Sequence, residues 1–288
     1  MINVSLLSAY SYCPRKIFLE RILKLAEVPK DVMIKGTIRH EVFDALNKNE
    51  QNIVRSVEPG HDQEAIQELY RKSVSVYLRN TIIKNKDSIT RIHLEPSQVY
   101  ASIMKHLLAE IDIRSRNVFD FKEQTKLSGE ELWLSLTPKI KSEYKVSSEI
   151  LRLTGVIDQV LVKKEELVPV ELKTGSSPKE GIWPGHRIQI AAYVMLLEET
   201  FDMSIKKGYI RYLDTPETDN LREVNINPFM REEVTDTRIK VEKLLSSSEL
   251  PEKEKNEKKC EKCGLREQCF NDILLKARLE AVFGQERA

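Results

Sequence analysis

The sequence predicts a mixed α/β (α+β) fold with a central sheet flanked by helices. Two runs rich in β-branched and aliphatic residues, Leu151–Val162 and Leu167–Thr174, are separated only by the charged Lys163–Glu166 and predict a β-hairpin. Helical patterns lie on both sides of this hairpin, and three of the four cysteines fall together near residue 265. At 288 residues, the chain is long enough for one large domain or two small ones.

Three charged residues of the hairpin are predicted to meet. If the turn is centred between residues 164 and 165, antiparallel pairing places Asp158 opposite Glu171, and Lys173 lies on the same face as Glu171. Two opposed carboxylates destabilise a sheet, so a hard divalent cation such as Mg²⁺ or Mn²⁺ between them is one interpretation. The alternative is an exposed face on which these charges are simply solvated. Apolar neighbours favour a central strand pair, whereas Pro169 favours an edge.

The first helices are predicted from caps and periodicity. Ser11 is a plausible N-cap for a helix near residues 8–16, with Pro14 in its first turn. Asp31 is expected to cap a second helix, Val32–Asn47, whose apolar residues recur at four-residue steps. Gly36 and His40 form a separate row on that helix, and a mid-helix glycine suggests a close approach of another group.

The later elements follow from the same signals. Further helices are expected at Asp62–Asn85, Pro96–Phe119, His186–Phe201 and Pro228–Ser246. Strands are expected at Ile140–Val146, before the hairpin, and at Lys207–Leu213 and Leu221–Ile226. A loop that contains Gly and Pro is expected after the hairpin, at Gly175–Gly185.

The cysteines are arranged as a remote Cys13 and a C-terminal C-x₂-C-x₅-C formed by Cys260, Cys263 and Cys269. Four thiols so placed favour a metal site over disulfides in a cytosolic protein. An iron–sulfur cluster and a Cys₄ zinc site both fit this spacing, and unrelated free thiols are the alternative. A ligand from position 13 would tie the two ends of the chain together.

Charge and hydropathy restrict the possible partners. The chain carries 46 Lys+Arg against 45 Asp+Glu, which excludes a global basic field, so nucleic acid would have to bind local patches. The first 40 residues are such a patch, with seven basic and three acidic residues, a net charge of +4. No stretch approaches the length of a membrane span, and no signal peptide is recognisable at the start, so we expect no membrane partner and a cytoplasmic location.

Taken together, these residues resemble a known family. Gly36-x-x-x-His40, Gly155-x-x-Asp158, Glu171-x-Lys173 and Gln189-x-x-x-Tyr193 stand in the order of the RecB-like branch of the PD-(D/E)XK nucleases. Tyr12-Cys13-Pro14-Arg15 and the C-terminal C-x₂-C-x₅-C are similar to those of CRISPR-associated exonucleases of the Cas-four family. Two departures are Ile157, in place of a proline, and a long separation between His40 and Asp158.

The resemblance implies a role for each matching residue. His40, Asp158, Glu171 and the backbone carbonyl of Leu172 would bind Mn²⁺ or Mg²⁺, and Lys173 would orient water or stabilise phosphoryl charge. Gln189 and Tyr193 would hold the nucleic-acid strand or support Lys173, with ordinary helix packing as the alternative. A [4Fe–4S] cluster would be bound by four residues, namely Cys13, Cys260, Cys263 and Cys269.

The resemblance also implies a division of the chain and an activity. The expected parts are residues 1–30 (helix with the first cysteine), 31–48 and 140–246 (nuclease core), 49–139 (mainly helical insertion) and 247–288 (linker and cysteine module). The implied activity is that of a metal-dependent deoxyribonuclease. It would act as an exonuclease on single-stranded DNA, and an additional endonuclease activity is left open. It would trim DNA for CRISPR spacer acquisition beside the spacer integrase complex. The alternatives are a DNA repair nuclease of the RecB/AddB type and a non-catalytic iron–sulfur scaffold. The basic first helix, with its interleaved tyrosines, would offer DNA contacts.

Overall fold

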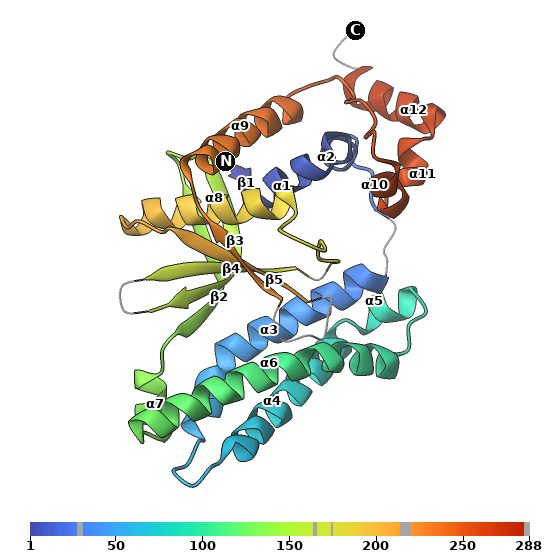
Figure 1. The fold of residues 1–288 in the computed structure, drawn as a ribbon. Helices are drawn as coiled ribbons and strands as arrows, with labels where there is room; N and C mark the ends of the chain where they lie inside the picture. Colours follow the sequence, from blue (N-terminus) through green and yellow to red (C-terminus); the bar gives the residue numbers. More distant parts are fainter. Residues whose placement is uncertain (28–30, 164–165, 174, 214–219, 285–288) are drawn as a thin grey trace.

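The sheet is the centre of the molecule in the computed structural model, which describes residues 1–27, 31–163, 166–173, 175–213 and 220–284. Within these ranges, six strands form one mixed sheet in the order β1-β3-β4-β5-β6, and β2 pairs antiparallel with β3 along its whole length (Figure 1). The strands are β1 (Ile2–Asn3), β2 (Lys139–Ser148), β3 (Leu153–Val162), β4 (Leu167–Lys173), β5 (Lys207–Tyr212) and β6 (Leu221–Asn225). The predicted mixed α/β fold is confirmed.

The hairpin has the register that the sequence predicts, over four residue pairs. Antiparallel pairing of β3 with β4 runs from Val162↔Leu167 to Gln159↔Val170 and ends there. Asp158 and Glu171 follow in that register but are not a backbone pair. Thr174, expected as the last residue of β4, lies outside the described residues, as do positions 164 and 165 of the turn.

β3 and β4 are central strands, as their apolar neighbours indicated. β4 lies between the antiparallel β3 and the parallel β5. Pro169 is tolerated there because pairing with β5 begins at Val170, one residue later. The edge position that a proline favours is therefore not adopted.

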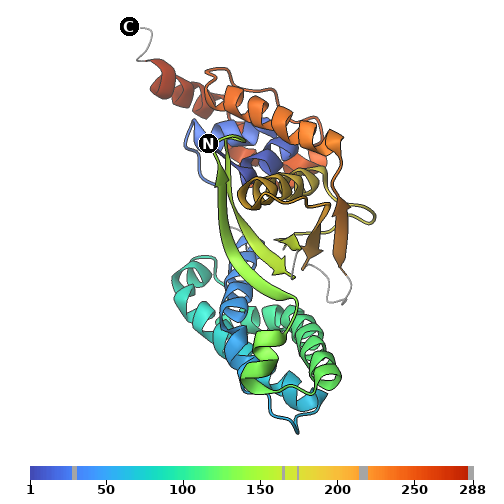
Figure 2. The same cartoon turned by 90° about the vertical axis from the view of Figure 1, so that its left-hand side faces the viewer.

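Helices cover both faces of the sheet. Ile157 and Ile210 belong to a core shared with α1 (Val4–Tyr12), α8 (Pro184–Phe201) and α9 (Pro228–Leu245). Val170 and Leu172 belong to a second core with a group of helices that we call the helical block. Its members are α3 (Asp31–Arg55), α4 (Gln63–Lys84), α5 (Lys86–Arg91), α6 (Pro96–Thr125) and α7 (Gly129–Ser135). Figure 2 shows the two groups of helices at opposite ends, with the long strands β2 and β3 running between them.

The N-terminus differs from the prediction. Ser11 does not cap a helix. It lies inside α1, which begins at Val4 under an Asn3 cap, and its hydroxyl bonds to the Leu7 carbonyl. Cys13 then breaks the helix with an extended backbone, and α2 (Pro14–Arg21) starts at the proline. The break sits at Cys13 because the residue before a proline is pushed out of the helical conformation.

In the helical block, α4 and α6 begin within one residue of their expected starts, whereas Asp31, expected as a cap, is the first described residue of α3 itself. Asp62 caps α4 by accepting a hydrogen bond from the Ala65 N–H (2.8 Å), and Pro96 opens α6. α3 runs on to Arg55 and so crosses the expected boundary at residue 48.

The C-terminal segment forms three short helices, α10 (Glu257–Lys262), α11 (Arg266–Cys269) and α12 (Asp272–Phe283). Leu265 and Leu275 of this segment pack against Ile17 and Phe18 of α2 in a third core. The two distant ends of the sequence therefore share one hydrophobic cluster. None of the helices in the described ranges is long and apolar enough to cross a membrane.

A buried ionic chain ties the helical block together. Arg114 of α6 is 4% exposed and donates to Glu110 (2.5 Å), to Glu50 of α3 (2.9 Å) and to the side-chain oxygen of Asn47. Glu110 in turn accepts a hydrogen bond from Arg211 of β5 at 2.5 Å. The chain therefore links α3 and α6 to the sheet.

Removing the centre of this chain should destabilise the fold. We expect Arg114→Ala to lower the free energy of unfolding by about 3–5 kcal/mol, because the buried Glu50 loses the cation paired with it and Glu110 keeps only Arg211. Urea titration measures the change. Arg116→Ala, on the same helix in an exposed pair with Asp112, is the matched control and should cost less than about 1 kcal/mol. Equal losses in the two variants would contradict a stabilising role for the buried chain.

Candidate active site and cysteine pocket

The hairpin charges meet where the β3–β4 ladder ends. There the side chain of Asp158, and not its backbone, bonds to β4: its Oδ2 accepts a hydrogen bond from the Leu172 backbone N–H at 2.7 Å. The ammonium of Lys173 lies 3.0 Å from Glu171 Oε1. Asp158 and Glu171 thus adjoin, although they are not an ordinary cross-strand pair.

Gln189 and Tyr193 of α8 join the same group by hydrogen bonds. Gln189 Oε1 accepts from Lys173 at 2.6 Å, and its Nε2 donates to Glu171 Oε1 at 2.6 Å and to the Tyr193 hydroxyl at 3.2 Å. The Tyr193 hydroxyl donates to the Val156 carbonyl of β3 at 2.8 Å. Gln189 and Tyr193 are only 4% and 3% exposed. α8 is therefore cross-linked to both strands of the hairpin through the charged residues.

Gly155 permits this close packing. A Cβ atom at this position would lie 2.7 Å from the Tyr193 ring and 3.3 Å from Val4. Real Cβ atoms do not approach other atoms as closely as 2.7 Å, so any side chain here would displace Tyr193 and, through it, Gln189. The glycine of the Gly155-x-x-Asp158 motif thus has a steric explanation.

His40 reaches the site from the helical block. Its Nδ1 lies 3.6 Å from Asp158 Oδ1. The other oxygen of Asp158, Oδ2, is the one that accepts the hydrogen bond from the Leu172 backbone N–H. Gly36, one turn earlier on α3, is buried. Burial lowers the pKa of His40, which leaves the imidazole neutral at pH 7 and able to act as a metal ligand.

Burial also dominates the two carboxyl groups. It raises the pKa of Asp158 to about 6, against the lowering effect of the Leu172 N–H and Lys173. It raises the pKa of Glu171 in the same way, with a further contribution from the charge of Asp158. Glu171 Oε2 is buried and has no hydrogen-bond partner. A buried carboxylate oxygen without a partner is costly and is suited to a cation.

The group is not yet arranged as a metal site. In the described part of the chain, no three or more His, Cys, Asp or Glu side chains are placed so as to hold a metal ion. Asp158 Oδ2 and Glu171 Oε1 are occupied by protein donors, Asp158 Oδ1 faces His40, and Glu171 Oε2 has no hydrogen-bond partner. The donor types fit Mn²⁺ or Mg²⁺, and binding would require small side-chain rearrangements.

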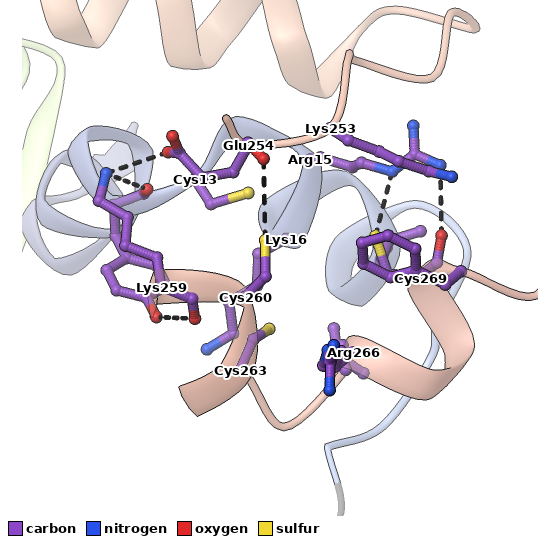
Figure 3. Close-up of a pocket in the computed structure, with 14 residues that line it drawn as sticks. Cys13, Arg15, Lys16, Lys253, Glu254, Lys259, Cys260, Cys263, Arg266 and Cys269 are labelled. Atoms are coloured by element: carbon purple, nitrogen blue, oxygen red, sulfur yellow. Dashed lines mark hydrogen bonds and ion pairs between the residues drawn. The ribbon is translucent and has the colours of Figure 1, made fainter. Parts of the chain in front are cut away.

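All four cysteines line a single pocket (Figure 3). Cys13 comes from the α1–α2 junction, and the other three come from α10, α11 and the turn between them. Burial raises the pKa of Cys13 and outweighs the backbone N–H groups of Arg15 and Lys16, which lower it. The fold therefore brings Cys13 next to three cysteines that lie about 250 residues later in the sequence.

Basic side chains surround these thiols. Arg15 is 7% exposed, and its Nε lies 3.2 Å from Cys269 Sγ, while its other nitrogens bond to the carbonyls of Pro251 (2.6 Å) and Cys269 (3.5 Å). Further cations line the pocket, with Glu254 as the acidic member: Lys16, Lys253, Lys259 and Arg266. A buried cation next to sulfur suits thiolates, which carry negative charge.

The same contacts limit the predicted DNA surface on the first helix. Arg15 is buried against the cysteine pocket, and Lys16 is paired with Glu27 at 2.7 Å. Arg15 is therefore not exposed as a phosphate contact, whereas Lys16 is partly exposed and its proposed contact with DNA stays a prediction.

Comparison with known proteins decides the family. The family model described as the PD-(D/E)XK nuclease superfamily matches residues 1–270. The chain belongs to the PD-(D/E)XK nuclease superfamily. The resemblance stated from the motifs is confirmed at this level.

Two curated relatives of this PD-(D/E)XK chain are described as CRISPR-associated exonuclease Cas4/endonuclease Cas1 fusions. The protein from Myxococcus xanthus is 31% identical over 149 residues, covering 50% of this chain and 25% of its own. The protein from Leptospira interrogans is 27% identical over 130 residues, covering 43% and 23%. The chain thus spans about a quarter of the length of these relatives. The solved structure of SSO0001 aligns with a TM-score of 0.35 and 17% identity, over 66% of this chain and 80% of that one.

Sequence reasoning missed Glu143, which adjoins the PD-(D/E)XK residues. Its neighbours Ser142 and Tyr144 pair with Gln159 and Ile157, so Glu143 occupies the register position that faces Asp158. Its backbone is left-handed, with φ +47°, and this interrupts the ladder. Burial raises the pKa of Glu143, and so does the nearby Asp44. Counting along β2 from a known register would have found it, but the register with β3 was not predicted.

Asp158→Asn should stabilise the metal-free protein. Because burial raises the folded-state pKa of Asp158 from 3.8 to about 6, ionising it costs folding free energy, and the loss develops as pH rises from about 4 to 6. Asn keeps an acceptor for the Leu172 N–H and does not ionise. With a chelator present, we expect no difference at pH 4 and a gain of up to about 3 kcal/mol above pH 6, at 1.36 kcal/mol per pKa unit. Chemical denaturation across this pH range measures the difference. A variant less stable than the parent at pH 8 would refute the idea that ionised Asp158 destabilises the folded protein.

Proposed function

We propose that this chain is a metal-dependent deoxyribonuclease that hydrolyses phosphodiester bonds in single-stranded DNA or at single-stranded ends. The observation that carries the proposal is the hydrogen-bonded group of Asp158, Glu171, Lys173 and Gln189 in a chain of the nuclease superfamily. A lysine beside two buried carboxylates is a chemical arrangement that a merely structural hairpin does not need.

The donor set supports a divalent cation at this position. His40, Asp158, Glu171 and the carbonyl of Leu172 would hold Mn²⁺ or Mg²⁺, with Glu171 Oε2 as the unpartnered buried oxygen. When bound, the cation supplies Lewis-acid polarisation of the phosphate and lowers the pKa of a coordinated water. The neutral His40 imidazole contributes a nitrogen donor without adding charge.

Lys173 would act on the reacting phosphate. Its ammonium is held by Glu171 Oε1 and Gln189 Oε1, so it is oriented before substrate binds and is able to donate to phosphoryl oxygens or to an attacking water. We assign Gln189 and Tyr193 positioning roles, because their burial favours support of Lys173 over contact with the strand. Ordinary helix packing would not require the bonds from Gln189 to both charged residues.

The cysteine pocket would hold a [4Fe–4S] cluster. All four thiols line it, and the buried Arg15 together with the surrounding lysines would offset the negative charge of thiolate-bound iron and sulfide. The cluster would act as a staple between α2 and the C-terminal helices. A Cys₄ zinc site remains the alternative, because zinc takes the same ligands.

The biological setting is proposed from the relatives. Both carry a Cas4 exonuclease name joined to a Cas1 endonuclease. We therefore infer that this chain processes DNA ends for CRISPR spacer acquisition and acts beside the spacer integrase complex. A RecB/AddB-like repair nuclease would use the same chemistry, and a spacer integrase encoded next to this chain would favour the first role. The intact group around Lys173 counts against a pure scaffold.

Substitutions at the site test the nuclease activity. With Mn²⁺ and a labelled single strand, we expect Lys173→Ala and Asp158→Asn to slow cleavage by about 100-fold or more. The first removes charge stabilisation of the transition state, and the second removes a carboxylate ligand of the cation. Lys163→Ala, in the exposed turn of the same hairpin, is the matched control and should cleave like the parent. Undiminished cutting by either site variant would remove the assignment.

Metal analysis of anaerobically purified protein tests the cluster. We expect a brown protein with about four iron atoms per chain and a broad visible absorbance that bleaches on reduction. Cys13→Ser should lower both the iron content and the melting temperature, because it opens the link between α2 and the C-terminal helices. A colourless preparation with one zinc ion per chain would overturn the iron–sulfur assignment.

A further inference from the structure

Trp183 is a large aromatic side chain left exposed beside the proposed active site. It ends the loop that leads from β4 to α8, and 46% of its surface is exposed. Lys173 lies just before this loop, and Gln189 lies on the second turn of the helix that follows. Its place in the sequence, between Lys173 and Gln189, is what distinguishes Trp183 from the other exposed apolar side chains of this protein.

The backbone and the indole of Trp183 are held in place. The indole Nε1 donates to the Ser176 carbonyl at 2.9 Å, and the backbone N–H of Trp183 points to the Tyr212 hydroxyl at 3.4 Å. Its carbonyl accepts from the first N–H groups of α8, those of His186 and Arg187, at 3.0 Å each. The polar atom of the ring is therefore satisfied within the protein, and the ring faces remain as the surface that a ligand can use.

The loop that carries Trp183 is fastened to the sheet. Arg222 of β6 donates to the carbonyls of Gly181 and Pro178, the latter at 2.9 Å. Its guanidinium also lies over the Tyr212 ring, 5.2 Å from the centroid. A rigid loop loses little conformational entropy when it binds a ligand, which favours a binding role.

Trp183 is connected to Lys173 by a short path. Tyr212, which faces the Trp183 backbone, is the register partner of Lys173 in the β4–β5 pair. The Tyr212 hydroxyl is also 3.0 Å from His186 Nδ1. Burial and the charge of Lys173 lower the pKa of His186 to about 3, so His186 lies within the electrostatic reach of the lysine and stays neutral.

We propose that Trp183 stacks on an unpaired nucleobase of the DNA strand whose phosphate lies at Lys173. A rigid ring with its N–H already bonded selects a flat ligand by its π faces, and the flat groups of a nuclease substrate are its bases. Bases inside a duplex are already stacked on each other, so the site selects single strands. This inference rests on the proposed nuclease function and adds the residue that recognises the strand.

Fluorescence tests the contact directly, because Trp133 and Trp183 are the only tryptophans in the sequence. Trp133 lies partly buried in the helical block and is replaced by Phe to leave Trp183 as the only indole. In the full chain with Asp158→Asn and a chelator, titration with oligothymidine should quench the emission of Trp183. A blunt duplex should quench it much less. Strand binding seen by anisotropy of a labelled strand without any quenching would overturn the proposal.

Three variants separate stacking from a structural role. Trp183→Ala should weaken single-strand binding by about 5- to 150-fold, the loss of one base–aromatic stack, with little change in kcat and a raised KM. Trp183→Phe keeps a ring but not the bond to Ser176, and should stay close to the parent. Phe201→Ala, at the other end of α8 with a 42% exposed ring, should have no effect. If Phe at position 183 is as weak as Ala, stacking is excluded.

The outcomes distinguish this inference from the proposed function. Cleavage by the Trp133→Phe protein with no effect of Trp183→Ala on strand binding would refute the stacking role and leave the nuclease intact. Quenching of Trp183 by single strands in a protein that never cleaves would refute the nuclease and keep the strand contact. Quenching by an apolar peptide but not by oligothymidine would assign the surface to a protein partner and overturn the proposal.

Discussion

The structure depends on keeping two carboxyl groups, the partly buried Asp158 and the buried Glu171, next to each other. Neither would be stable there without its partners: Asp158 accepts the Leu172 N–H, and Glu171 accepts from Lys173 and Gln189. Even so, burial raises the pKa of both groups. The free-energy cost of ionising these two carboxyl groups is one that a bound ligand can reduce. The elements packed around the hairpin keep the two groups in place despite that cost.

Each layer of the fold contributes one part of that packing. α8 supplies Gln189 and Tyr193 and requires a glycine at position 155 to come close enough. The helical block supplies His40, and the buried chain through Arg114 and Glu110 holds that block to β5, which pairs with β4. The site is therefore a junction between two cores, and it would be lost if either layer shifted.

The cysteine pocket joins the N-terminal and C-terminal parts of the chain. α2 is anchored between α1 and the C-terminal helices by a hydrophobic cluster and by Arg15 against Cys269. α1 packs against α8, which carries the residues that orient Lys173 (Figure 1). A group bound by the four thiols would thus stabilise α1, the helix against which α8 packs.

The sequence by itself determined the local features. It predicted the hairpin register and most helices and strands, because alternation, caps and turn chemistry act over a few neighbours, and it left open whether β3 and β4 were central or edge strands. It missed the break at Cys13, and it could not place Glu143 opposite Asp158 or Trp183 beside Lys173. Only the tertiary structure decided that the ladder stops at Gln159, that Gln189 bonds to both charged residues, and that Arg15 faces sulfur and not DNA. These outcomes depend on which distant elements share a buried space, and burial and pairing energies between them leave no local pattern in the chain.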